Sequence, residues 1–145
     1  MPNNLNCPEE STNTVKSKNK LSMLLLIIVY LGIWAVSIIA FWFFINESDA
    51  MGYSIMVMWG ILPVTTFVIS LIIGKNNYMG KRKWIFSVVF GIMYMLAEYA
   101  TFSTANMITF KKINAPQFEM ILVGIIVSIV GMGIGSGIKY AKSNL

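Results

Sequence analysis

The chain has 145 residues, of which 57% are hydrophobic and only 12% are charged, and its formal net charge at pH 7 is +5. Soluble domains carry about twice that share of charged residues, so the composition excludes an ordinary soluble globular domain. The hydrophobic residues are gathered in four long blocks, which predicts an all-α integral membrane protein built as a bundle of four transmembrane helices.

The first predicted span covers about 21–45, contains no ionisable residue and follows a polar tail over 1–20. At a rise of about 1.5 Å per residue it is longer than the hydrocarbon core of about 30 Å, so we expect it to cross with some tilt. It also exceeds the roughly 7–15 apolar residues of a signal peptide, and we expect it to stay in the protein. The single cysteine, Cys7, precedes this span and cannot close an intramolecular disulfide.

The other hydrophobic blocks predict three further spans, over about 51–74, 84–110 and 120–138. The second contains Pro63 near its middle, and the third contains one acid, Glu98. Together the four spans form a predicted transmembrane domain over 21–138, followed by a tail over 139–145. The connections are too short to bury a core of their own, so we expect no domain outside the membrane.

The cations predict the orientation. Three lysines precede the first span, four cations follow the second and two lysines follow the fourth, whereas the connection between the third and fourth spans has only Lys111 and Lys112. Because Lys and Arg concentrate on the cytoplasmic side, this distribution predicts that both termini lie in the cytoplasm, an N-in/C-in topology. We expect the cations there to face anionic lipid headgroups, which accounts for the positive charge without a nucleic acid partner.

Several kinds of chemistry are excluded by the residues present. The chain has no histidine and one cysteine, which excludes Ser-His and Cys-His nucleophilic sites and leaves no set of ligands for zinc or iron. A glycine-rich run, 131–137, is superficially similar to a phosphate-binding loop, but it lies inside a hydrophobic helix with no preceding strand. We therefore expect no enzymatic activity, no metal and no cofactor.

Glu98 is the one acid within a predicted span, near the midpoint of the third. An ionised carboxylate at that depth costs at least about 2.5–3.5 kcal/mol, and such residues usually face the interior of a bundle or a wet cavity. A helical wheel puts six small, hydroxyl or aromatic residues on the same face: Gly91, Tyr94, Thr101, Phe102, Ala105 and Thr109. Tyr94 and Thr101 are therefore candidate members of a polar site with Glu98.

Thr65 and Thr66 of the second span lie at a similar depth and are further candidate members of this site. Pro63 cannot donate a backbone hydrogen bond, and the carbonyls that it frees are available to a protonated Glu98 or to a cation. Two interpretations stay open. Glu98 binds a proton or cation, or it donates a structural hydrogen bond across helices worth about 0.6–2 kcal/mol.

The fourth span carries a predicted packing face made of small residues at spacings of four, three and four: Gly124, Ser128, Gly131 and Gly135. Such residues let helix backbones approach closely. Gly133 and Gly137 form a second pair on another face. We favour internal packing over dimerisation for this helix, although two faces leave room for both.

The sequence resembles two known families in part. Four spans with one membrane glutamate resemble the small multidrug resistance transporters, but their essential glutamate lies in the first helix. The tetrapeptide 101–104, Thr-Phe-Ser-Thr, resembles part of the signature of the small fluoride channels, whose glycine-rich, arginine-bearing first helix and pore asparagine are absent here. Neither resemblance assigns a family or transfers a residue role.

Two classes of function remain. The first is a non-catalytic membrane subunit or regulator that packs against another membrane protein, and the second is a small oligomeric transporter or channel that uses Glu98 as a proton or cation site. The sequence favours the first, because no second polar residue marks a pathway. Lysine outnumbers arginine, with many isoleucines and asparagines, which is compatible with an AT-rich genome and with our expectation of a bacterial cell membrane.

Overall fold

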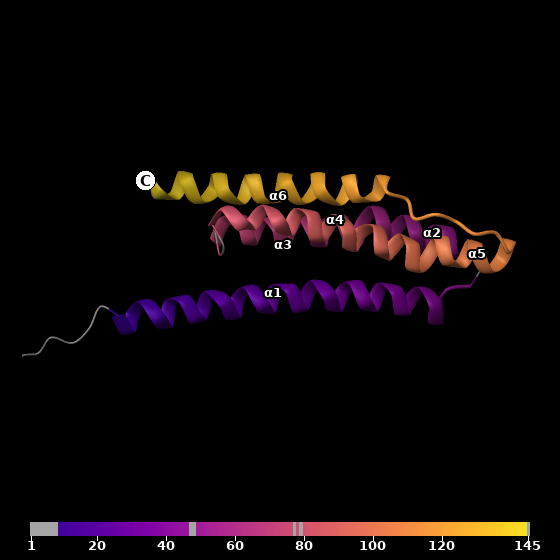
Figure 1. Cartoon of the computed structure of the whole chain (residues 1–145), viewed down its shortest axis with the longest axis horizontal. Coiled ribbons are helices and arrows are strands. Elements are labelled where there is room, and N and C mark those ends of the chain that lie inside the picture. Colours follow the sequence, from indigo (N-terminus) through magenta and orange to yellow (C-terminus); the bar gives the residue numbers. More distant parts are fainter. Residues whose placement is uncertain (1–8, 47–48, 77, 79, 145) are drawn as a thin grey trace, which may run out of the picture.

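A computed structural model describes residues 9–46, 49–76, 78 and 80–144, and these ranges contain helices and loops but no strand. Four of its helical stretches are long and apolar enough to cross a membrane: Lys20–Phe44, Ala50–Asn76, Trp84–Phe110 and Glu119–Ser143. Their axes are roughly aligned, and consecutive stretches run in opposite directions (Figure 1). The predicted all-helical architecture with four stretches of membrane-spanning length is confirmed, and it suggests an integral membrane protein. Cys7 lies outside the described residues.

The first and last stretches are single helices, α1 (Glu9–Phe44) and α6 (Glu119–Ser143). Both extend beyond the predicted spans, because the flanking residues, lysines among them, include good helix formers that continue the backbone hydrogen bonding past the apolar segment. The parts that the sequence suggests as tails, 1–20 and 139–145, are therefore partly helical in the described region.

The two middle stretches are each divided by a wider, π-helical segment. The second consists of α2 (Ala50–Ser54), the π-helix η1 (Ile55–Ile61) and α3 (Leu62–Asn76). After the short 3₁₀ helix η2 (Gly80–Lys83), the third consists of α4 (Trp84–Glu98), the π-helix η3 (Tyr99–Ser103) and α5 (Thr104–Phe110). Two such interruptions in adjacent stretches are notable because π-helical turns are rare and are found frequently at functional sites.

The core lies where α6 packs between α3 and α4. A Cβ added at Gly124 would lie 2.8 Å from the Cα of Gly91, and one added at Gly131 would lie 2.7 Å from the carbonyl oxygen of Phe67. One added at Gly135 would overlap the carbonyl oxygen of Leu71. A larger side chain at these positions would keep the helix backbones apart. The small residues therefore let the backbones touch, which increases van der Waals packing between these helices.

Helix α1 lies along the other side of α3 and α4 and is separated from α6 (Figure 1). Its buried residues include Tyr30, whose ring meets that of Phe90 edge-on with centroids 4.7 Å apart. Two indole N–H groups tie α1 to the third stretch: Trp34 donates to the Met93 carbonyl at 2.8 Å, and Trp42 donates to the Ala100 carbonyl at 3.0 Å. Polar contacts thus supplement a limited apolar interface.

Helix α6 is displaced along the bundle axis relative to its neighbours. We name the end at which α3 connects to α4 the hairpin end, and the opposite end, where α5 leads to α6, the loop end. Figure 1 shows that α6 projects beyond the hairpin end and begins well short of the loop end. The extended segment 111–118 bridges that distance, after Lys111 ends α5 in a left-handed conformation. As a result, α6 reaches the core beside η1 only with its first turns, through Met120 and Val123, and does not cover α2 and α5.

Candidate functional site

Glu98 is the last residue of α4 and directly precedes the π-helix η3. Its side chain is buried, with 4% of its surface exposed. It lines a cleft of about 220 Å³ together with eight residues from three parts of the chain: Met51, Ser54, Ile55, Met58, Trp59, Phe102, Gln117 and Met120. We call this space the Glu98 cleft. The Glu98 cleft lies between the second helical stretch, η3 and the start of α6.

The displacement of α6 explains why this cleft exists. Gln117 belongs to the loop that leads into α6, and Met120 lies in its first turn. Farther toward the loop end, no turn of α6 fills the space between η1 and η3. The cleft is bounded on one side by the exposed Trp59, so it opens onto the apolar surface of the bundle.

One oxygen atom of the Glu98 carboxyl group makes no hydrogen bond in the described structure. Among the described residues, its Oε2 atom is buried and has no hydrogen-bond partner. A buried polar group without a partner costs about 1–3 kcal/mol, and more when it is charged. In the described structure, Oε2 therefore makes no cross-helix hydrogen bond of the kind that a purely structural Glu98 would use.

The Met58 carbonyl, which Pro63 leaves without a backbone donor, accepts a hydrogen bond from the Tyr94 hydroxyl. The N–H of Leu62 donates to the Val57 carbonyl, five residues earlier, in the π-helical register. The next donor in this register would be residue 63, whose acceptor is the Met58 carbonyl, but proline has no N–H. The Tyr94 hydroxyl donates to the Met58 carbonyl instead. Tyr94 therefore completes the hydrogen bonding of η1 rather than binding Glu98.

The three threonines have different environments. Thr101 is buried and donates to the Ala97 carbonyl at 2.7 Å within its own helix. Thr65 donates to the Ile61 carbonyl at 2.7 Å, again within its own helix, and Thr66 is fully buried beside Tyr30 of α1. Thr101 also lies 3.4 Å from the Glu98 backbone carbonyl, to which it donates a second, longer hydrogen bond. None of the three threonines hydrogen-bonds to the Glu98 side chain in the described structure.

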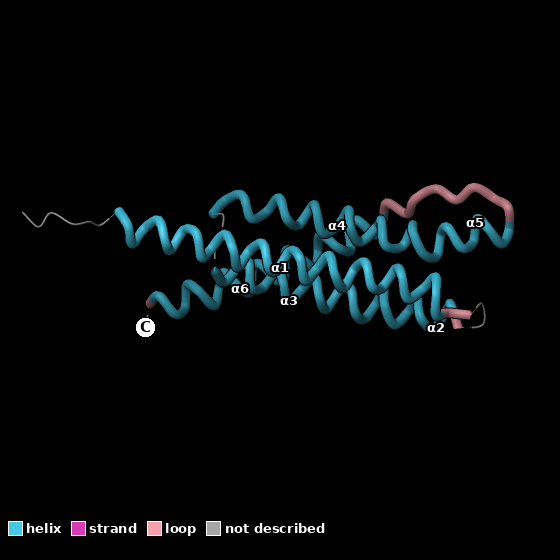
Figure 2. The backbone as a smooth tube through the Cα atoms, turned by 90° about the horizontal axis from the view of Figure 1, so that it is seen from below, coloured by secondary structure: helices cyan, strands magenta, loops and turns pink. Residues whose placement is uncertain are grey.

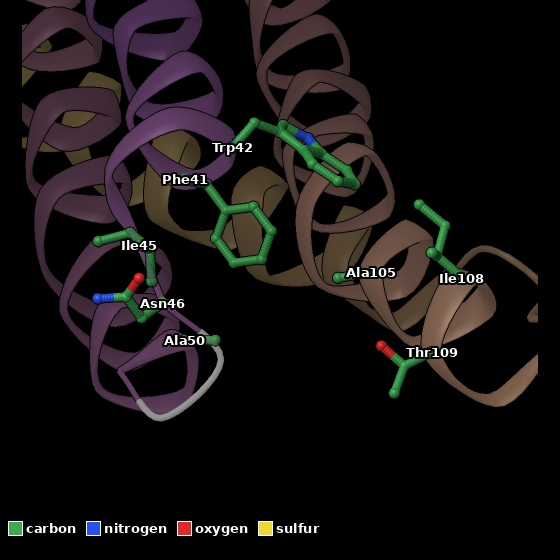
Figure 3. Close-up of a pocket in the computed structure, with 8 residues that line it drawn as sticks. All are labelled: Phe41, Trp42, Ile45, Asn46, Ala50, Ala105, Ile108 and Thr109. Carbon is green, nitrogen blue, oxygen red and sulfur yellow. The ribbon is translucent and has the colours of Figure 1, made fainter.

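The π-helix η3 changes which residues share a face with Glu98. An extra residue in this turn rotates the chain that follows, so that Ser103 is buried and Thr109 is exposed. Ala105 and Thr109, which the regular helical wheel puts beside Glu98, instead line a second pocket between the end of α1 and α5, with Phe41 and Trp42 (Figure 3). For these two residues the wheel is corrected, because it assumes an uninterrupted period of 3.6 residues.

A chain of hydroxyls in the core was not anticipated from the sequence. The Ser128 hydroxyl lies 2.8 Å from that of Ser70 on α3 and 3.2 Å from that of Ser87 on α4. All three serines are buried, and the glycines of α6 lie on either side of Ser128. The only sequence signal was the presence of serines inside apolar spans, which usually face other helices.

The described residues contain no group of three or more His, Cys, Asp or Glu side chains that could hold a metal ion. No protein family model, curated protein sequence or solved structure matches this chain. Among the described residues, Glu98 carries the one buried carboxyl group, and the other residues that line its cleft are uncharged. Such a cleft can hold a proton or one positive charge.

Proposed function

We propose that the chain is an integral protein of a bacterial cell membrane, with both termini in the cytoplasm. The positions of the cations support this orientation. Lys75 and Lys83 lie next to the α3–α4 connection, and the last part of α6 carries Lys139 and Lys142, all toward the hairpin end. The 111–112 lysine pair follows α5 at the loop end. The more positive end of a membrane protein faces the cytoplasm, where it meets anionic headgroups.

The orientation can be tested by cysteine labelling in intact cells, starting from a Cys7→Ser background. Ile113→Cys, at a position 94% exposed in the loop after α5, should react with a membrane-impermeant maleimide. Ser143→Cys, at the exposed end of α6, should react only after the cells are permeabilised. The opposite pattern would invert the topology.

For function, we propose a small non-enzymatic transporter or channel in which Glu98 binds a proton or a cation. One observation carries this proposal: Glu98, which is 4% exposed, lines a cleft and has one carboxyl oxygen without a hydrogen-bond partner among the described residues. Intramembrane acids mark ion or proton pathways by default, and a structural acid would be expected to hydrogen-bond within the bundle.

The protein is expected to act as an oligomer. The α6 face around Gly133 and Gly137 supports this, since a Cβ added at either glycine would meet nothing within 4 Å.

The second candidate is a non-catalytic subunit or regulator that packs against another membrane protein. The displacement of α6 favours it, because α2 and α5 present a side that α6 does not cover (Figure 1). In that case a partner helix would occupy the open side and would supply the hydrogen bond that Glu98 lacks. The two candidates differ in whether Glu98 exchanges protons with water in the isolated protein.

An infrared titration of the carboxyl groups in lipid nanodiscs tests the proposal. Glu98→Gln assigns the Glu98 band, and Glu119→Gln, at an exposed acid in the first turn of α6, serves as the matched control. Reversible titration of the Glu98 band between about pH 5 and 9 would support a proton or cation site. A band that stays protonated throughout and exchanges deuterium slowly would overturn this proposal and favour the second candidate.

A further inference from the structure

A half-buried lysine links the α3–α4 connection to the last helix, and the function proposed for Glu98 does not use it. The Nζ atom of Lys83 donates a hydrogen bond to the Ser136 hydroxyl of α6 at 2.7 Å and lies 5.8 Å from the centroid of the Trp84 ring. These contacts hold the ammonium group in one place. The hydrogen bond to Ser136 uses one of its three N–H donors.

The close contact between α3 and α6 brings two more lysines to the same place. A Cβ added at Gly135, the residue before Ser136, would lie 2.8 Å from the backbone nitrogen of Lys75 at the end of α3. Because α3 and α6 run in the same direction, Lys139, one turn beyond Gly135, is on the face of α6 that meets the end of α3 (Figure 1). We name Lys75, Lys83 and Lys139, which come from three elements, the lysine cluster.

The segments that carry the lysine cluster have no acid close to it. The sequence contains neither Asp nor Glu over 50–97 or 120–145. Asp49 and Glu119 lie just before α2 and at the start of α6, toward the other end of the second and fourth stretches. Like charges that are drawn together repel, so a bound anion would relieve an unfavourable interaction at this point.

The lysine cluster borders the apolar surface of the bundle. Trp84, which is exposed, begins the third stretch, and the exposed Tyr140 follows Lys139 on α6. Tryptophan and tyrosine rings prefer the interface between membrane and water. Ile134 and Ile138 of α6 are exposed as well. A ligand at this place therefore meets cations with one part and an apolar surface with another.

We propose that the lysine cluster binds one anionic glycerophospholipid, with its phosphate between the three ammonium groups and its acyl chains along the exposed apolar surface of α6. Basic pockets between transmembrane helices bind lipid headgroups in this way. A soluble phosphate ester has the same charged group but gains nothing from the apolar surface. A zwitterionic lipid has both parts, but the lysines repel its ammonium group. This inference goes beyond the function proposed for Glu98 and does not depend on it.

A specific site differs from the general attraction of cations to an anionic leaflet. General attraction depends on how many cations lie near the membrane surface, and it does not depend on which helix carries them. A specific site instead requires Lys75, Lys83 and Lys139, because the contact at Gly135 and the hydrogen bond to Ser136 bring these three together. The two cases are therefore separated by charge-removing substitutions at different places on the same end of the bundle.

The test titrates the full-length protein, in a neutral detergent, with phosphatidylglycerol and follows binding by native mass spectrometry. One phosphatidylglycerol should bind first, at least about tenfold more tightly than phosphatidylcholine, because several cations act on its charge. Lys83→Gln should weaken this first binding about fivefold, the contribution of one cation near an anionic headgroup. Lys20→Gln is the matched control and should leave it unchanged. It removes an exposed lysine from α1, which is separated from α6.

Two further variants keep the result interpretable. Lys139→Gln changes an exposed side chain, so the fold is not at risk, and it should weaken the first binding by a similar factor. Ser136→Ala should weaken it less than Lys83→Gln, because Lys83 keeps its charge and loses only its anchor.

The outcomes that would overturn the inference are distinct. Equal binding of phosphatidylglycerol and phosphatidylcholine, or equal losses in Lys20→Gln and Lys83→Gln, would leave only general attraction. Displacement of phosphatidylglycerol by an equal concentration of glycerol 3-phosphate would identify a soluble phosphate ester as the ligand instead of a lipid. The infrared titration of Glu98 is a separate measurement, so the proposed function stands or fails independently of these results.

Discussion

The Tyr94 hydroxyl donates a hydrogen bond to the backbone carbonyl of Met58, the acceptor that Pro63 would serve if it carried an N–H. A residue on α4 thereby satisfies a carbonyl that a proline on the neighbouring stretch leaves unpaired. Because both groups are buried, water cannot take over this bond. The π-helical geometry of η1, and with it one wall of the Glu98 cleft, depends on this contact between helices.

Tyr94→Phe should therefore destabilise the protein by about 1–3 kcal/mol, the cost of a buried polar group left without its partner. The measurement is the free energy of unfolding in a detergent-denaturant titration. In a Pro63→Ala background the same substitution should cost less, because residue 63 then has an N–H that can donate to the Met58 carbonyl. Equal losses in the two backgrounds would show that Pro63 and Tyr94 are not coupled.

Gly131→Ala should destabilise the bundle of a single chain, whereas Gly133→Ala should be neutral or slightly stabilising within that bundle and should weaken only contacts between chains. An added Cβ at Gly131 would lie 2.7 Å from the Phe67 carbonyl oxygen, but at Gly133 it would meet nothing within 4 Å. Overpacking of this kind typically costs about 1–3 kcal/mol, while alanine improves a helix by about 0.5–1 kcal/mol over glycine. Thermal unfolding of the two variants side by side checks the difference, and similar melting temperatures would argue against this packing of α6.

Ser128→Ala should cost more stability than Ser87→Ala. Ser128 lies at the centre of the hydroxyl chain and contacts the hydroxyls of both Ser70 and Ser87. Ser87 contacts one hydroxyl, that of Ser128, and donates to the Met132 thioether sulfur at 3.9 Å, which is a weak acceptor. Interhelical hydrogen bonds of this type contribute about 0.6–1.7 kcal/mol each in membrane proteins. A double-mutant cycle between Ser70 and Ser128 should give a coupling energy in that range, and additive effects would indicate that the two hydroxyls do not interact.

Trp34→Phe should loosen α1 without unfolding the other helices. The substitution keeps an aromatic ring but removes the N–H that donates to the Met93 carbonyl at 2.8 Å. Hydrogen–deuterium exchange should accelerate in α1, the helix nearest the viewer in Figure 2, and should change little in α6, which Figure 1 shows on the other side of α3 and α4. Trp84→Phe, at an exposed ring without an indole hydrogen bond in the described structure, is the control and should leave α1 unchanged. Uniform exchange across all helices in Trp34→Phe would contradict the local role.

Much of the fold was predictable from local properties of the sequence. The four apolar blocks are long enough to cross a bilayer. A segment that crosses lipid is expected to be helical, because there each backbone polar group must find its hydrogen-bond partner within the protein. The spacing of Gly124, Gly131 and Gly135 predicted one smooth face on the last helix, and these residues lie at its buried contacts with α3 and α4. The midspan position of Glu98 in the third block identified it as the candidate polar centre.

The π-helical segments were not predictable in the same way. Nothing in the residues of η1 or η3 distinguishes them from α-helix, since the choice of hydrogen-bond register depends on which carbonyls find partners on neighbouring helices. The Met58 carbonyl finds its partner in Tyr94, 36 residues away. The resulting rotation after η3 separates Ala105 and Thr109 from Glu98, which a uniform helical wheel cannot reproduce.

By itself, the sequence determined the number, length and apolar character of the membrane-length helical stretches, together with the presence of one acid, Glu98, near the middle of the third. Only the tertiary structure decided how far α6 lies along the bundle, because that position follows from close contacts between particular glycines and backbone atoms of α3 and α4. Had α6 extended to the loop end, its side chains would fill the space between η1 and η3. The Glu98 cleft is therefore a product of packing, whereas the carboxyl group inside it was already evident from the sequence.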